Sequence, residues 1–192
     1  NEIGVNEPLT VIGNMCKSNG TIFHVDAAQG AFANLDVIDT QADLMSLSSH
    51  KVYGPKGIGA LYISQQANIK PQPIIYGGGQ QDGFRSGTLC PFLVAGIGSA
   101  FEIMQKEKDK EAIHDRKLRT ILLDGLKDIF PSLVLNGSLE NRHPGNLNIT
   151  LPNVDARQFI FNLQPAIAFS TGSACTSGIT EPSHVLRAIG LS

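Results

Sequence analysis

Two stretches decide the fold class: Thr21-Ile-Phe-His-Val-Asp26 and Asp43-Leu-Met-Ser-Leu-Ser-Ser-His-Lys51. The first is rich in β-forming residues and stops at Asp26, which predicts a short strand. The second is largely apolar over residues 43–47 and then turns to hydroxyls, a histidine and a lysine. A third apolar run, Ile58-Gly-Ala-Leu-Tyr-Ile63, follows. Short apolar runs of this kind are typical of buried strands in a parallel sheet, so we expect such strands here.

Helical patterns flank these strands. Residues 8–19 predict a helix that begins at Pro8 and ends at Asn19-Gly20. Apolar residues recur at helical spacing over residues 93–104, and again over residues 118–129, where Pro131 ends the pattern. The alternation of strands with helices favours an α/β fold over all-α and all-β folds.

The rest of the chain has shorter elements. Strands are expected at residues 132–135, 146–151 and 166–170, and helices at residues 155–163 and after Thr180. Thr180 is the expected N-cap of the last helix, and Gly190 its C-terminal glycine.

A dense charge run at residues 105–111 separates the two parts of the chain. We interpret it as a solvated helix end or a domain junction. The predicted domains are therefore residues 1–107, an α/β domain with a mixed or parallel sheet, and residues 108–192, a smaller α+β domain.

Composition excludes several classes of function. With 15 Lys+Arg and 17 Asp+Glu the net charge is -2, which argues against a general nucleic-acid binder. No run reaches the roughly 18 apolar residues of a membrane span. The three cysteines, Cys16, Cys90 and Cys175, form no C-x-x-C pair, and their odd number favours a reducing compartment over a disulfide framework.

Residue types that carry chemistry gather at the ends of the first two predicted strands, where ligand sites of open α/β sheets lie. Asp26 follows the first strand, and Ser48, His50 and Lys51 follow the second. Taken alone, Lys51 is more often a surface residue, and Asp26 the start of an Asx-turn. Together, an acid, a lysine and small donors favour a pyridoxal phosphate site, because that cofactor needs an acid at its ring nitrogen and a lysine for attachment. His24, on the strand before Asp26, is expected to pack in the core.

Cys175 lies in Ser170-Thr-Gly-Ser-Ala-Cys-Thr-Ser-Gly178, a run of small residues without an apolar anchor. Free cysteines are usually buried, and an exposed thiol is open to oxidation. We therefore interpret Cys175 as a mobile nucleophile rather than a bystander, with a thiol pKa tuned towards neutrality. Cys16, within the first helix pattern, is expected in the core, and Cys90 matches no catalytic feature.

Together these motifs resemble a known family. His24-Val-Asp-Ala-Ala-Gln29, the segment ending in His50-Lys51 and Tyr53-Gly-Pro-Lys-Gly-Ile-Gly-Ala-Leu61 resemble class V, fold-type-I pyridoxal-phosphate enzymes. Gly77-Gly-Gly-Gln80, Arg85-Ser-Gly-Thr88 and the Cys175 segment narrow the resemblance to cysteine desulfurases of the NifS/IscS type. It implies that residues 1–107 form the C-terminal part of the large cofactor domain, and residues 108–192 the small domain with the catalytic cysteine. We interpret Gly77, Gly78 and Gly79 as residues of turns that let the backbone approach the cofactor or a dimer interface.

The resemblance assigns the central chemistry to four residues. Lys51 would attach pyridoxal phosphate as a Schiff base and move the substrate Cα proton. Cys175 would take up the substrate sulfur as a persulfide. Asp26 would pair with the ring nitrogen, and Gln29 would bond the phenolic oxygen of the ring.

Five further cofactor contacts are implied. Ser48 and His50 would contact the phosphate, and Ser49 would donate to it through its backbone. Asn1 would lie against the cofactor and the substrate carboxylate. Thr88 would reach the phosphate bound by the other subunit, which implies a homodimer. No metal site is expected.

The implied reaction removes sulfur from L-cysteine, giving L-alanine and a persulfide that passes to an iron–sulfur scaffold or a thiolation protein. A cytoplasmic location is expected, or a mitochondrial one in a eukaryote, without binding to nucleic acid or membrane. Family members are about twice as long, so the chain is expected to be a fragment lacking an N-terminal part and the C-terminal end. The alternatives are a selenocysteine lyase, another class V enzyme, or a catalytically incomplete fragment that binds partners.

Overall fold

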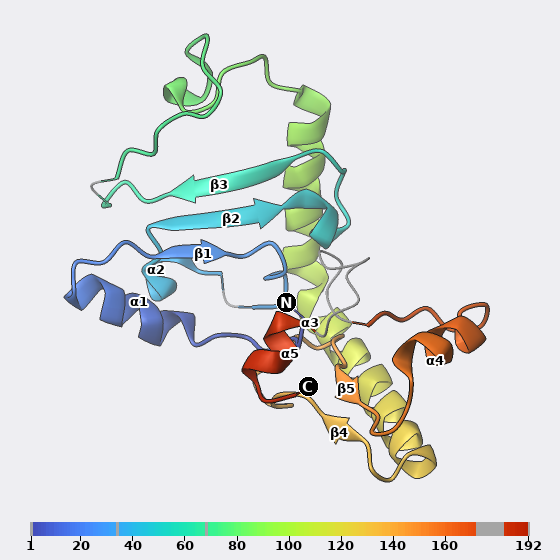
Figure 1. The fold of residues 1–192 in the computed structure, drawn as a ribbon. Coiled ribbons are helices and arrows are strands. Elements are labelled where there is room, and N and C mark those ends of the chain that lie inside the picture. The colour runs from blue at the N-terminus through green and yellow to red at the C-terminus, as the bar shows by residue number, and fades with distance from the viewer. Residues whose placement is uncertain (1, 34, 68, 172–182, 192) are drawn as a thin grey trace. The chain divides into compact units, whose positions relative to one another are not determined.

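The computed structural model describes residues 2–33, 35–67, 69–171 and 183–191. Helices and strands follow one another in the order α1, β1, α2, β2, β3, α3, β4, β5, α4 and α5 (Figure 1). The chain divides into two compact units, residues 7–112 and residues 1–6 together with 113–192. Within the described ranges, no helix is long and apolar enough to cross a membrane.

A three-stranded sheet lies in the unit of residues 7–112 (Figure 1). β1 (His24–Asp26) pairs parallel with β2 (Leu44–Ser48), and β2 pairs antiparallel with β3 (Gly59–Ile63). All three strands are predicted, but the expectation that β3 is a buried parallel strand is wrong: it is antiparallel and largely exposed. The connection, residues 49–58, is too short for the crossover of about a dozen or more residues that parallel pairing requires.

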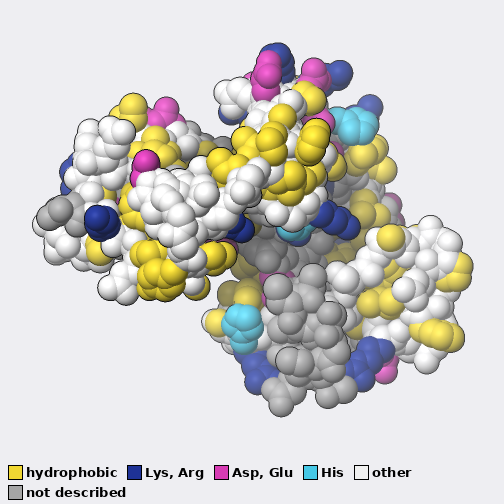
Figure 2. Space-filling view, turned by 90° about the horizontal axis from the view of Figure 1, so that it is seen from above, with side chains coloured by type: hydrophobic (Ala, Val, Ile, Leu, Met, Phe, Trp, Pro, Cys, Tyr) yellow, Lys and Arg dark blue, Asp and Glu magenta, His cyan; other side chains and the backbone are white. Residues whose placement is uncertain are grey.

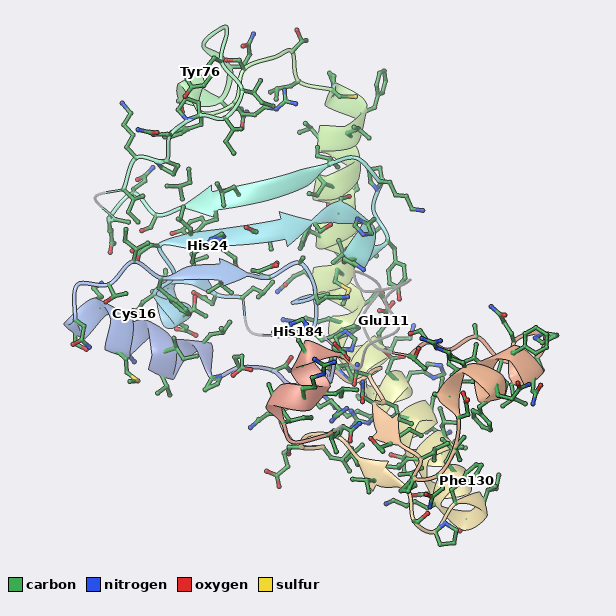
Figure 3. The ribbon with its side chains drawn as sticks, viewed as in Figure 1. Cys16, His24, Tyr76, Glu111, Phe130 and His184 are labelled. Atoms are coloured by element: carbon green, nitrogen blue, oxygen red, sulfur yellow. The ribbon has the colours of Figure 1, made fainter. Side chains whose placement is uncertain are left out.

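The two faces of the sheet differ because successive side chains alternate between them. Val25 and Met45 lie on the face that packs against Leu9 of α1 (Leu9–Ser18) and Val37 of α2 (Val37–Thr40). The other face carries His24 and Asp26 of β1 beside Ser46 and Ser48 of β2. His24 is exposed there and its Nε2 lies 2.8 Å from Ser46 Oγ, so the expectation that it packs in the core is wrong (Figure 3). The two-residue period of the strand places His24 on the same face as Asp26.

The helices around this sheet are only partly predicted. α1 confirms the first predicted helix: Pro8 precedes it, and Gly20 follows it with φ of +62°. The short helix α2 is not predicted; Asp36 caps it by accepting hydrogen bonds from the N–H groups of Ile38 and Asp39. A four-residue helix gives too short a pattern to be detected by periodicity.

Helix α3 (Pro91–Ile129) is a single helix of 39 residues where the sequence predicts two. The charge run at residues 105–111 therefore lies inside the helix, and its interpretation as a helix end is wrong. The run contains neither glycine nor proline and consists mainly of good helix formers. Ion pairs one turn apart support it, with Lys106 Nζ 2.6 Å from Glu102 Oε1 and Lys110 Nζ 3.5 Å from Glu107 Oε2.

The second unit combines a small sheet with two helices. β4 (Val134–Leu135) pairs antiparallel with β5 (Ile149–Thr150), and α4 (Ala156–Leu163) begins after Asp155, whose carboxylate caps it. The strand predicted at residues 166–170 does not form. A strand needs a partner for its backbone groups, and none of the described strands pairs with this segment.

The last helix, α5 (His184–Ala188), ends as predicted before Gly190, whose φ is +85°. Its N-cap is Ser183, whose Oγ accepts a hydrogen bond from Val185 N at 3.1 Å. The predicted N-cap, Thr180, lies outside the described residues.

Residues 2–6 belong to the second unit, where they pair with residues 141–143. His143 N donates to Gly4 O at 2.7 Å, and Asn6 N donates to Asn141 O at 2.7 Å. Arg142, at the centre of this pairing, is 5% exposed, and its guanidinium donates to the Ser138 carbonyl at 2.8 Å. Burial lowers the pKa of Arg142, and the nearby positive charge of Arg119 lowers it further.

Candidate active site

The carboxyl ends of β1 and β2 bring most of the predicted site residues together. Asp26 ends β1 and Ser48 ends β2, and these two strands run parallel with Asp26 opposite Ser46. Both ends therefore lie at one edge of the sheet. A 3-10 turn, Ser49–Val52, follows β2 directly and carries His50 and Lys51. One edge thus presents a carboxylate, hydroxyls, an imidazole and an amine.

Local hydrogen bonds order the turn after β1. Asp26 Oδ1 accepts from Ala28 N at 3.0 Å, and Ala27 N donates to Ser46 O at 2.9 Å. The Asx-turn considered for Asp26 is therefore present, yet the side chain of Asp26 stays exposed. Gln29, three residues further on, is exposed as well.

The side chains at the end of β2 and in the turn after it differ in exposure. Ser48 Oγ lies 3.0 Å from His50 Nδ1, which orients the exposed imidazole. The side chain of Lys51 is exposed. Ser49, in contrast, is 0% exposed, and its N–H donates to Ile58 O at 3.2 Å. Its Oγ has no hydrogen-bond partner among the described residues.

Ser49 closes the turn that carries Lys51. Gly54 N donates to Ser49 O at 3.0 Å, so residues 49–54 form a closed loop. Val52, inside this loop, is buried against Ala100 and Met104 of α3. The backbone at Lys51 is thus held from both sides while its side chain reaches solvent.

Gly54→Ala tests this packing. A Cβ at Gly54 would lie 2.3 Å from Ser49 Oγ and 3.0 Å from Ala100 Cβ. We expect the free energy of unfolding to fall by about 1–3 kcal/mol, the usual cost of overpacking, as measured by urea denaturation. Gly98→Ala in α3 is the matched control: apart from the neighbouring backbone of its own helix, no atom would lie within 4 Å of the added Cβ, and we expect a gain of about 0.5–1 kcal/mol from helix propensity. Equal effects of the two substitutions would contradict the packing described here.

Thr88 lies in the connection between β3 and α3, not in the strand ends or the turn that carries Lys51. It is exposed, lies just before α3, and belongs to the segment that projects beyond β3 (Figure 1). The other two cysteines also lie elsewhere: Cys16 is half-buried in α1, rather than in the core, and Cys90 is exposed.

Two predicted site residues, Asn1 and Cys175, lie outside the described residues. Glu2 and Ser183, which border the undescribed residues 1 and 172–182, contact each other. Ser183, directly after residues 172–182, donates its Oγ proton to Glu2 Oε2 at 2.7 Å, and Asn148 Nδ2 donates to Glu2 O at 3.1 Å. Sequence reasoning missed Glu2, and no local signal could reveal a contact between residues so far apart. It also missed Ser46, which the alternation of β2 with Ser48 could have revealed.

An α/β sheet with an acid and a lysine at neighbouring parallel strand ends is the arrangement that the resemblance to fold-type-I enzymes leads us to expect. The family described as aminotransferase class-V matches residues 1–191, and the chain belongs to this family.

Named relatives are more specific. The chain is 47% identical over 192 residues to cysteine desulfurase IscS of Photobacterium profundum, covering 100% of this chain and 47% of that protein. It is 47% identical to the mitochondrial cysteine desulfurase of Eremothecium gossypii, covering 99% of this chain and 39% of that protein. The chain therefore spans about half the length of the curated relatives it matches.

A solved structure confirms the predicted fold. The NifS-like protein from Rickettsia africae matches with a TM-score of 0.87 and 30% identity, over 100% of this chain and 50% of that chain. The prediction of an α/β, fold-type-I architecture and the resemblance to NifS/IscS-type desulfurases are both confirmed.

Proposed function

We propose that this chain is part of a pyridoxal-phosphate-dependent cysteine desulfurase, which removes sulfur from L-cysteine and releases L-alanine. The observation that carries the proposal is the meeting of Asp26, Ser48, His50 and Lys51 at one edge of the sheet. The names of the relatives support the same reaction.

The residues at this edge fit the cofactor. Asp26 offers an exposed carboxylate that can keep a pyridine nitrogen protonated, and Lys51 offers an exposed amine that can attach to an aldehyde. Ser48 and His50 offer a hydroxyl and an imidazole for a phosphate. Bound pyridoxal phosphate supplies an electron sink at the substrate Cα. The N–H of Ser49 is already bonded to Ile58 O, so the proposal gives Ser49 the role of holding the turn.

Two residues carry the remaining steps of the proposal. The Lys51 amine removes the substrate Cα proton and later returns a proton to the product. The Cys175 thiolate attacks the substrate sulfur: an S–S bond to Cys175 forms as the substrate Cβ–S bond breaks. The electron pair of the broken bond goes to the carbon skeleton, and Cβ takes up one proton. The sulfur stays on Cys175 as a persulfide, and the carbon skeleton leaves as alanine.

Gln29 and Asn1 complete the set of cofactor contacts in this proposal. Gln29 would bond the phenolic oxygen of the ring, from the turn that follows Asp26. Asn1 would lie against the cofactor and the substrate carboxylate, next to Glu2.

The proposal includes a homodimer in which Thr88 reaches the phosphate bound by the other subunit. Large exposed apolar side chains in the same part of the chain support a surface that a partner covers: Ile74, in the segment that leads to Thr88, is 92% exposed, and Phe92, in the first turn of α3, is 86% exposed. Figure 2 shows hydrophobic side chains exposed in patches. The persulfide would pass to an iron–sulfur scaffold or a thiolation protein, in the cytoplasm or in mitochondria.

The proposal also keeps the predicted division into a large cofactor domain and a small domain near residue 108. The boundary between the two compact units, at Ala112 and Ile113, supports it, although residues 1–6 group with the C-terminal unit.

The test uses the complete natural protein with pyridoxal phosphate. We expect alanine from L-cysteine, with one persulfide on the protein in the first turnover before an acceptor is added. L-selenocysteine is offered in parallel. Alanine from L-selenocysteine but not from L-cysteine would replace the proposal with a selenocysteine lyase, and alanine from neither would refute both.

A further inference from the structure

The segment of residues 74–90, which leads to Thr88, is exposed yet internally bonded. Ile74 and Tyr76 are largely exposed, and the segment projects beyond β3, as the position of Tyr76 shows (Figure 3). An exposed loop with few apolar contacts is expected to be mobile unless its polar groups bond to one another. In this segment they do.

Ser86 forms the first cross-connection. It is 4% exposed, its Oγ donates to Gly78 O at 2.7 Å, and its N–H donates to Ile75 O at 3.3 Å. Arg85 Nη1 donates to Ser86 O at 2.8 Å. Ser86 therefore ties the end of the segment to its beginning.

Gln80 forms the second cross-connection. Its Oε1 accepts a hydrogen bond from Gly87 N at 3.1 Å, and Gly87 directly precedes Thr88. Gly87 has φ of +113°, a conformation that residues other than glycine rarely adopt. The hydrogen bond to Gln80 thus holds a conformationally permissive glycine at the position directly before Thr88.

The glycines make these connections possible. A Cβ at Gly78 would lie 2.7 Å from Gln80 Oε1, and a Cβ at Gly77 would lie 3.2 Å from Ser86 Cβ. The sequence predicts that these glycines let the backbone approach the cofactor or a dimer interface. The structure shows that Gly77 and Gly78 make room for Ser86 and Gln80.

We propose that Gln80 and Ser86 are positioning residues for Thr88, holding it in the conformation that meets the cofactor phosphate on the partner subunit. The inference rests on the proposed function, which places Thr88 at that phosphate. Neither residue needs to touch the cofactor. Each restricts the conformations of Thr88 before the cofactor binds. A loop that is already held in its bound conformation loses less conformational entropy on binding.

The experiment compares two ligands in the complete natural protein stripped of cofactor: pyridoxal phosphate and pyridoxal, which lacks the phosphate. Thr88→Ala should weaken binding of pyridoxal phosphate and leave pyridoxal unchanged. Gln80→Ala should show the same pattern, with the Kd for pyridoxal phosphate raised about fivefold, as for one lost hydrogen bond. Gln72→Ala, at an exposed glutamine outside the cross-connections, is the matched control and should bind both ligands normally.

The double variant Gln80→Ala/Thr88→Ala decides the mechanism. If Gln80 acts through Thr88, the double variant should bind pyridoxal phosphate no more weakly than Thr88→Ala alone. Additive losses, or equal losses with pyridoxal, would overturn the inference, since they would show a general structural role. If Thr88→Ala weakened binding while Gln80→Ala did not, the inference alone would fail. If Thr88→Ala had no effect, the Thr88 contact of the proposed function would fail and the inference with it.

Discussion

Lys51→Ala is expected to lower alanine formation from L-cysteine by roughly a thousandfold or more. The substitution removes the amine that attaches the cofactor and moves the Cα proton, and a positioned acid–base group alone contributes about 10²–10⁴-fold. The backbone at Lys51 is held by the Ser49–Gly54 bond and by buried Val52, so the fold should survive. The measurement is the rate at which the complete protein releases alanine from L-cysteine, followed in samples stopped at set times.

The matched control for Lys51 is Lys56. It is exposed and lies in the same connection between β2 and β3, but not at the end of a strand. We expect Lys56→Ala to keep nearly full activity. Borohydride reduction of the unsubstituted protein, followed by peptide mass analysis, should find the cofactor fixed to Lys51. A label on Lys56 would refute the assignment.

Cys175→Ala should abolish persulfide formation while leaving cofactor binding and colour unchanged. The substitution removes the one atom that receives the substrate sulfur and leaves Asp26, Ser48, His50 and Lys51 unchanged. Persulfide is measured by alkylation and mass analysis after a single addition of L-cysteine. The pair of variants separates the two roles, because only Lys51→Ala should also lose the covalent attachment of the cofactor.

The other two cysteines are the controls for Cys175. Cys90 is exposed and Cys16 is half-buried in α1, so both can be replaced by alanine without opening a large cavity. We expect both variants to form persulfide normally. Persulfide on Cys90 in the Cys175→Ala protein would move the sulfur-accepting role to the segment next to Thr88.

Local patterns predict much of the fold and of the site. The three strands of the first sheet, α1, α4 and the end of α5 lie where apolar runs, caps and glycines indicate. Errors arise where a local pattern has two meanings. The charge run at residues 105–111 is as compatible with the exposed middle of a helix as with a helix end. The sequence of β3 is the same kind of apolar run whether its neighbouring strand is parallel or antiparallel.

For the site, too, local patterns predict some features and not others. By itself, the sequence determines that Asp26 and Ser48 stand at strand ends, because each directly follows an apolar run whose β-conformation follows from its own residues. His50 and Lys51 come two and three residues after Ser48, so they lie close to the same strand end. Only the tertiary structure decides which way the neighbouring side chains face and what they meet. His24 lies beside Ser46, Ser49 turns inward, Gln80 reaches Gly87, and Glu2 bonds to Ser183. Local conformation is set by stereochemistry within a few residues, whereas contacts between distant segments depend on how whole strands and loops pack, which no local pattern encodes.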